Sequence, residues 1–96
     1  MKKGDKIEVV VKMVKIDETT AYSKDGLPYL SHKHRIYYMT DDNGNTYVFE
    51  SKEGMYVAEE NEVFKMRATV KMVTEFTNHK LWIDVIRCRN ANKYKH

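Results

Sequence analysis

The sequence predicts an all-β domain in which five strands close into a small barrel. The segment Val63–Glu75 alternates apolar residues with polar or charged ones along its length. Such a period of two is typical of a strand that has one face in a core and the other in water. β-branched residues dominate residues 7–16, and the dipeptide Asn43-Gly44 predicts a tight turn between two further apolar segments.

The first predicted strand covers residues 7–16. Its apolar parity changes from Val11 and Met13 to Val14 and Ile16, which predicts a β-bulge or a sharp bend near Met13. A bent first strand is typical of small barrels, because one strand then serves both halves of the sheet. A long polar connection follows, with a turn signal at residues 23–26 and the only proline, Pro28.

Four more strands are predicted at residues 34–40, 46–50, 63–75 and 80–88. The acidic connection 51–62 has room for one short helical turn around residues 57–61, and residues 77–79 turn the chain into the last strand. Residues 1–90 are expected to form one domain, and residues 91–96 a basic, frayed tail. This order predicts a five-stranded Greek-key barrel of the OB-like type, with an SH3-like barrel as the alternative.

Composition limits the class of protein. The 17 basic and 14 acidic residues give a net charge of +3, which is too small to prove a polyanionic partner by itself. The single cysteine, Cys88, excludes an intramolecular disulfide and a cysteine-based zinc cluster, and a free thiol fits a reducing compartment. No apolar run is long enough to span a bilayer, and Met1-Lys2-Lys3 is not followed by an apolar stretch. We therefore expect a cytoplasmic location and no membrane partner.

Basic and aromatic residues are the candidate binding groups. Proteins that bind single strands combine cations that contact phosphates with rings on which bases stack. Strand 63–75 is expected to present three cations and no acid on its solvated face, and Arg35 is expected on the same side of its strand as Tyr37. The predicted phosphate contacts are Arg35, Lys65, Arg67 and Lys71.

The predicted stacking rings are Tyr37, Tyr47, Phe49 and Trp82. Adjacent strand residues point to opposite faces, so one of Tyr37 and Tyr38 should face outward, and we expect Tyr37 because the other parity carries Ile36. Leu81 and Ile83 share a core-like parity, which sends Trp82 outward with Asp84 and Ile86. The alternative is that these rings fill the barrel core and that the charges serve solubility alone.

Metal binding and catalysis are not expected. His32 and His34 share a parity, but no acid or cysteine nearby offers a third ligand, and Lys33 and Arg35 would repel a cation. The chain has no glycine-rich phosphate loop and no recognisable grouping of a nucleophile with a base. We expect no cofactor and no enzymatic activity.

The segment 36–49, with its Asp41-Asp42-Asn43-Gly44-Asn45 turn and the aromatic strand after it, carries a resemblance to a known family. It resembles the second hairpin of small OB-fold single-stranded nucleic-acid-binding proteins of phages and mobile elements. Residues 64–73 and 80–89 resemble the closing hairpin of those proteins. The resemblance implies binding of single-stranded nucleic acid; of the two kinds we expect DNA rather than RNA. The tail is basic, whereas replication-type proteins of this kind end in an acidic tail, so a housekeeping replication role is not expected.

Together these observations predict non-catalytic binding of single-stranded nucleic acid with little sequence preference, and a replication or recombination protein as a further partner. The rival prediction is a protein-binding module, such as a phage-type inhibitor or an accessory subunit of a nucleic-acid enzyme. Trp82, Ile86 and the cluster Met55-Tyr56-Val57 would then form the contact patch. Self-association through strand edges, giving a homo-oligomer, is a third possibility.

Overall fold

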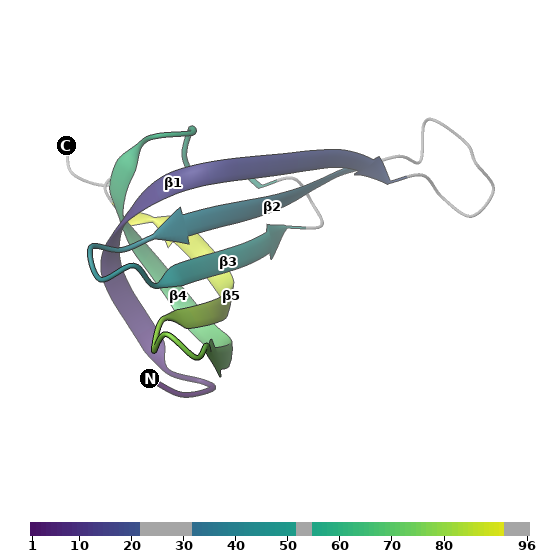
Figure 1. Cartoon of the computed structure of the whole chain (residues 1–96). Coiled ribbons are helices and arrows are strands. Elements are labelled where there is room, and N and C mark those ends of the chain that lie inside the picture. Colours follow the sequence, from purple (N-terminus) through teal and green to yellow (C-terminus); the bar gives the residue numbers. More distant parts are fainter. Residues whose placement is uncertain (22–31, 52–54, 92–96) are drawn as a thin grey trace.

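The computed structural model describes residues 1–21, 32–51 and 55–91 and forms a closed β-barrel, which confirms the predicted fold class (Figure 1). The strands are β1 (Lys6–Ala21), β2 (His32–Thr40), β3 (Thr46–Ser51), β4 (Val63–Glu75) and β5 (Leu81–Asn90). Their order around the barrel is β1-β2-β3-β5-β4. β3 and β5 are parallel, and the other neighbours are antiparallel. The architecture is consistent with an OB-like or an SH3-like barrel. The described residues include no helix that is both long and apolar enough to cross a membrane.

Strand β1 closes the barrel because it serves two neighbours. Its first half pairs with β4 from Lys6 to Lys12, and its second half pairs with β2 from Lys12 onward. The register shifts between Met13 and Lys15, so the predicted bulge is confirmed. Val14 is the extra residue and lies exposed, not in the core. Past the end of β3, whose pairing with β2 stops at Arg35, the last residues of β1 and the first of β2 continue as a two-stranded arm (Figure 1).

The core consists of the inward-facing residues of all five strands and of the segment before β4. Its fully buried large side chains include Met13, Tyr37, Met39, Tyr47, Phe64, Met66 and Ile83. Val57 and Ala58 also belong to this core, although no strand carries them. The helical turn expected at residues 57–61 does not form, because residues 55–59 have no regular secondary structure and the chain turns only at residues 60–61, where Glu62 N donates to Glu59 O at 3.1 Å. This irregular segment places both Val57 and Ala58 against the core, while Glu59 and Glu60 are exposed.

Two further irregularities change which residues face outward. Between Val70 and Met72 the β4–β5 register shifts, so Val73 takes the inward position and Met72 is 55% exposed. The unbroken alternation expected for residues 63–75 would have placed Met72 in the core with Phe64 and Met66, and for Met72 that expectation is wrong. A second shift lies opposite Arg87, whose φ of 54° marks a bulge in β5. β5 also continues to Asn90, beyond the predicted end at residue 88.

Asp41 organises the predicted turn between β2 and β3. Its Oδ1 accepts hydrogen bonds from the backbone nitrogens of Asn43 at 2.9 Å and Asn45 at 3.0 Å, and its Oδ2 accepts one from the Tyr47 hydroxyl at 2.9 Å. Gly44 has a φ of 83°, a conformation that glycine adopts without strain. Burial by itself would raise the pKa of Asp41, but the donated hydrogen bonds outweigh it, and the pKa is lowered.

Candidate nucleic-acid interface

Three of the four predicted stacking rings lie in the core. Tyr37, Tyr47 and Phe49 are 1%, 2% and 6% exposed, so the prediction that they stack bases is wrong. Tyr37 and Phe49 stack on each other instead, with centroids 6.1 Å apart and an interplanar angle of 12°. Each buried hydroxyl has an acceptor, since Tyr37 donates to the Met55 carbonyl oxygen at 2.5 Å and Tyr47 donates to Asp41. Satisfied hydroxyls are what allow tyrosine rings to be buried.

The error came from choosing the wrong face of β2. Tyr37 shares its parity with Met39, which is fully buried, whereas Ile36 faces outward with Tyr38. On β3, Tyr47 and Phe49 share one face and Val48 lies on the other, as parity predicted. The face that carries the two rings is the inward one, so both rings are buried.

Trp82 lies on the outer face, as its parity predicted, and two other rings surround it. The Tyr38 ring meets it edge-on at 6.2 Å and 65°, and the Phe76 ring does so at 6.2 Å and 66°. Phe76 is 46% exposed, and Tyr38 and Trp82 are partly exposed. We call Tyr38, Phe76 and Trp82 the aromatic cluster. It offers water-exposed ring surface on the outside of the sheet, which is the feature that base stacking requires.

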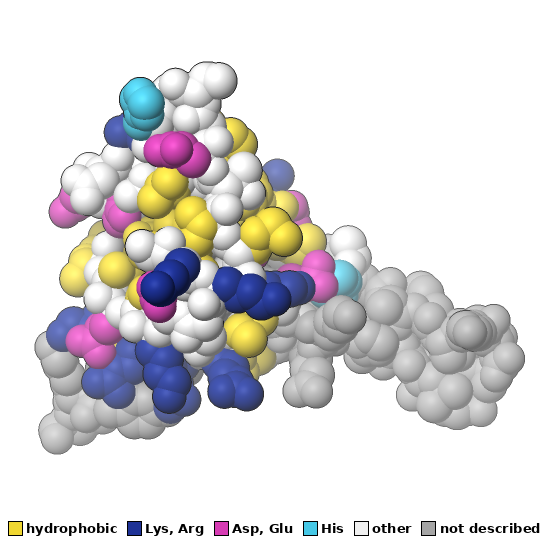
Figure 2. Space-filling model, turned by 90° about the horizontal axis from the view of Figure 1, so that it is seen from below, with side chains coloured by type: hydrophobic (Ala, Val, Ile, Leu, Met, Phe, Trp, Pro, Cys, Tyr) yellow, Lys and Arg dark blue, Asp and Glu magenta, His cyan; other side chains and the backbone are white. Residues whose placement is uncertain are grey.

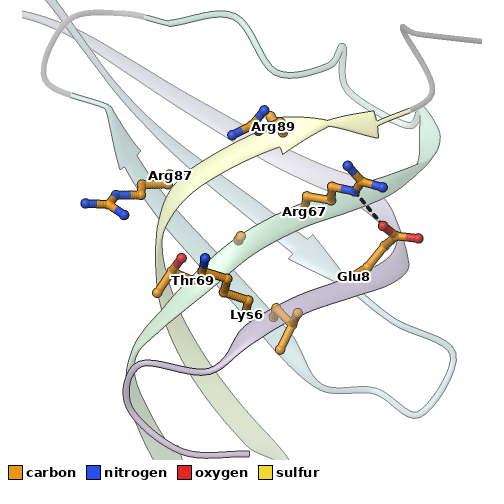
Figure 3. A pocket seen from close by; sticks show the side chains of 8 residues that line it. Lys6, Glu8, Arg67, Thr69, Arg87 and Arg89 are labelled. Atoms are coloured by element: carbon orange, nitrogen blue, oxygen red, sulfur yellow. Dashed lines mark hydrogen bonds and ion pairs between the residues drawn. The ribbon is translucent and has the colours of Figure 1, made fainter.

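A groove lined by cations lies on the outer face of β1, β4 and β5 (Figure 3). It has a volume of about 440 Å³. We call it the basic groove; its lining residues are Lys6, Ile7, Glu8, Arg67, Ala68, Thr69, Arg87 and Arg89. β1 contributes Lys6, β4 contributes Arg67, and β5 contributes the other two arginines. Each comes from a strand position that the register brings to the same side of the barrel.

The bulge in β5 is the reason that two arginines reach this groove. Ile83 and Val85 point inward, so an unbroken strand would also turn residue 87 inward. The bulge shifts the parity, so Ile86 and Arg87 both face water and Cys88 takes the inward position. Arg89 then faces outward again, opposite Arg67. Bulges commonly redirect a side chain in this manner near functional sites.

Glu8 partly neutralises the predicted cations of β4. Its Oε2 accepts a hydrogen bond from Arg67 Nε at 2.5 Å, and its Oε1 lies 3.5 Å from Lys65 Nζ. The hydrogen bond from Arg67 holds the pKa of Glu8 below its ordinary value. β4 does carry no acid on this face, but the register places Glu8 of β1 directly opposite Arg67. No acid among the described residues forms an ion pair with Lys6, Arg87 or Arg89, which leaves their charge available to a ligand.

Of the four predicted phosphate contacts, only Arg67 lines the groove; Lys65, Arg35 and Lys71 do not. Arg35 shares a side with Tyr37 as predicted, but that side faces inward, and its Nε bonds Glu18 Oε2 at 2.7 Å. It lines a separate cavity of about 360 Å³ beside Tyr56. It lies apart from the basic groove, and its role as a phosphate contact stays a prediction. Lys71 is exposed beside the bulge in β4, on the strand that also carries Arg67.

β5 joins the aromatic cluster to the basic groove. Its outward residues run from Trp82 through Asp84 and Ile86 to Arg87, roughly 16 Å along the strand at about 3.3 Å per residue. Figure 2 shows a face of the molecule on which Lys and Arg side chains gather beside hydrophobic ones. A flexible polyanion with flat apolar groups would find both kinds of contact along this strand.

The residues missed from the sequence are Lys6, Tyr38, Phe76, Arg87 and Arg89. Parity required one of Tyr37 and Tyr38 to face outward, and the prediction chose Tyr37 instead of Tyr38. Arg89 had been placed beyond the last strand, and nothing in the sequence marks the bulge that turns Arg87 outward.

No metal centre accompanies these surfaces in the described part of the chain. There, no three His, Cys, Asp or Glu side chains gather closely enough to hold a metal ion. His34 Nε2 lies 3.5 Å from Glu50 Oε2, and the side chain of His32 is outside the described residues.

Comparison with known proteins gives no relative: no family model, curated protein or solved structure matches this chain.

Proposed function

We propose that this chain is a non-catalytic protein that binds single-stranded nucleic acid, DNA in preference to RNA, on the outer face of an OB-like barrel. The observation that carries the proposal is the arrangement on β5, where the aromatic cluster at Trp82 continues into the basic groove at Arg87 and Arg89. The strand order and the bent β1 support the OB-like arrangement, an architecture that binds oligonucleotides. OB barrels commonly use strands 2 and 3 and the adjoining loops, whereas the basic groove of this chain lies on β1, β4 and β5. The buried free thiol of Cys88 fits a reducing compartment such as the cytoplasm.

Single strands fit this surface better than duplexes. The aromatic cluster can stack only on bases whose faces are open, and in a duplex those faces are covered by neighbouring base pairs. Each ring that stacks on a base contributes about 1–3 kcal/mol to binding. With the three cations that lack an acidic partner in contact with phosphates, log K should fall with log salt at a slope of about −2.

The test uses the single tryptophan as a reporter. Titration with a short oligothymidylate should quench the fluorescence of Trp82, and anisotropy of the labelled oligonucleotide should give the salt slope. Oligouridylate of the same length tests the preference for DNA. Absence of both quenching and anisotropy change at low salt would refute the proposal.

Two variants separate stacking from packing. Tyr38→Ala removes a ring from the aromatic cluster and should weaken binding by about 1–3 kcal/mol. Tyr37→Phe alters the neighbouring residue, which faces the core, and should leave affinity unchanged while lowering the free energy of unfolding by about 1 kcal/mol through the lost bond to Met55. Equal affinities for wild type and Tyr38→Ala would exclude the cluster as the stacking surface.

A second candidate is the protein-binding module, favoured by exposed apolar residues. Met55 and Tyr56 are nearly half exposed and Ile86 is also exposed. Val57 does not belong to such a patch, because it is fully buried. A salt-insensitive complex with one replication or recombination protein, formed without any oligonucleotide, would select this function. Sedimentation would reveal the remaining possibility, a homo-oligomer.

A further inference from the structure

Asp84 occupies the centre of the outer face beside the aromatic cluster. It alternates with Trp82 and Ile86 on β5, and all three point outward. Its Cα partners are Val48 on β3 and Met72 on β4, and Val48 is in turn paired with Tyr38 on β2. Asp84 is therefore flanked by apolar or aromatic side chains on both neighbouring strands and along its own strand.

The carboxylate of Asp84 has no partner that explains this position. Within residues 1–21, 32–51 and 55–91, it takes part in no hydrogen bond and no ion pair, although it is partly buried. The carboxylate oxygens still reach water, since the fully enclosed side-chain polar atom without a hydrogen bond in the described residues is His34 Nε2. Glu8 and Asp41, by contrast, already accept hydrogen bonds from Arg67 and from the turn amides. A donor carried by a ligand would therefore meet no internal competitor at Asp84.

The ligand chemistry follows from the fact that an ionised carboxylate only accepts hydrogen bonds. Guanine presents two adjacent donors on its Watson–Crick edge, a ring N–H and an amino group, and they match the two carboxylate oxygens. Cytosine and adenine each present one amino donor. Thymine and uracil present a single N–H between two carbonyl oxygens, which the carboxylate repels. The negative charge of Asp84 also repels phosphates, so it directs base edges to this spot and leaves phosphates to Arg87 and Arg89.

Resting on the proposed function, we propose that Asp84 reads the Watson–Crick edge of a base that stacks on Trp82. The site then prefers guanine over thymine or uracil. A good bidentate pair between a side chain and a base discriminates by about 1–3 kcal/mol, so a single guanine should improve binding by about tenfold.

The test compares oligonucleotides that differ at one base. The parent is an oligothymidylate of about ten nucleotides, a length within the range that one OB-like barrel covers. Its central thymine is replaced by guanine, by hypoxanthine (which lacks the amino donor) or by cytosine, and anisotropy gives each affinity. Wild-type protein should bind the guanine oligonucleotide about tenfold more tightly than the parent, with hypoxanthine and cytosine between them. Asp84→Asn should bind all four within about twofold, because its amide cannot accept both donors.

The outcomes separate this inference from the proposed function. If wild-type protein binds all four oligonucleotides equally, Asp84 reads no base edge, although binding itself stands. If Asp84→Asn keeps the full preference for guanine, another group reads the base and the inference is overturned. If no oligonucleotide binds, the proposed function fails and the inference fails with it. Thermal unfolding of Asp84→Asn controls for folding, and we expect a Tm equal to that of wild type because the carboxylate has no partner in the described structure.

Discussion

Glu8 gives the sharpest test of the basic groove, because its carboxylate competes with any phosphate for the same cations. It accepts a hydrogen bond from Arg67 Nε at 2.5 Å and lies 3.5 Å from Lys65 Nζ. The substitution Glu8→Gln keeps the size of the side chain and removes its charge. A phosphate can then contact Arg67 and Lys65 without first displacing an anion. We therefore expect tighter binding from the loss of a negative charge that lies in the groove itself.

The size of the effect follows from the charges of the groove. The wild-type protein offers three cations without an acidic partner in the described structure, Lys6, Arg87 and Arg89, which gives a salt slope of about −2 on single strands. Glu8→Gln adds one net positive charge, so the slope should steepen by about 0.7. The contribution of counterion release to the affinity vanishes near about 1 M salt. A slope that is steeper by about 0.7 over the tenfold range down to about 0.1 M salt therefore means roughly fivefold tighter binding at about 0.1 M.

The measurement is fluorescence anisotropy of a labelled oligothymidylate over a salt series. Glu18→Gln is the matched control, since it makes the same change of charge at an acid that pairs with Arg35, outside the basic groove. An unchanged slope for Glu8→Gln would refute the assignment of this groove to phosphates. Equal shifts for Glu8→Gln and Glu18→Gln would mean that net charge acts, not the position of Glu8.

Two predictions concern the fold. Asp41→Ala removes the acceptor of the Tyr47 hydroxyl and of two turn amides, so urea unfolding at neutral pH should show a loss of about 2 kcal/mol. The pKa of Asp41 is lowered in the folded state, so its stabilisation is present above the unfolded value of about 3.9 and is lost as the pH falls through the folded value. The stabilities of wild type and Asp41→Ala should therefore converge in acid, and a difference that stays constant down to about pH 2 would contradict this account. Cys88 is fully buried, and burial raises the pKa of its thiol to about 12, so iodoacetamide at pH 8 should label the protein only after unfolding. Rapid labelling of the native protein would show that β5 opens readily.

Local patterns in the sequence predicted the strands, the turn after β2 and the bulge in β1, but not the bulges in β4 and β5. The alternation in Val63–Glu75, the Asn43-Gly44 turn and the change of parity near Met13 all predicted features that the structure contains. These signals are readable because strand period and turn conformation depend on residues close together in the chain, and a bulge is readable only where it changes the apolar parity. The outward position of Trp82 followed from the same rule.

Tertiary structure alone decided which surface can bind a ligand. Parity shows that Tyr37 and Tyr38 lie on opposite faces, but only closure of the barrel decides that Tyr37 is the buried one. Pairing between distant segments places Glu8 opposite Arg67, and a bulge in β5 turns Arg87 outward. The physical reason is that the register of two strands depends on the packing of the whole core, and a shift of one residue exchanges every inward side chain for an outward one.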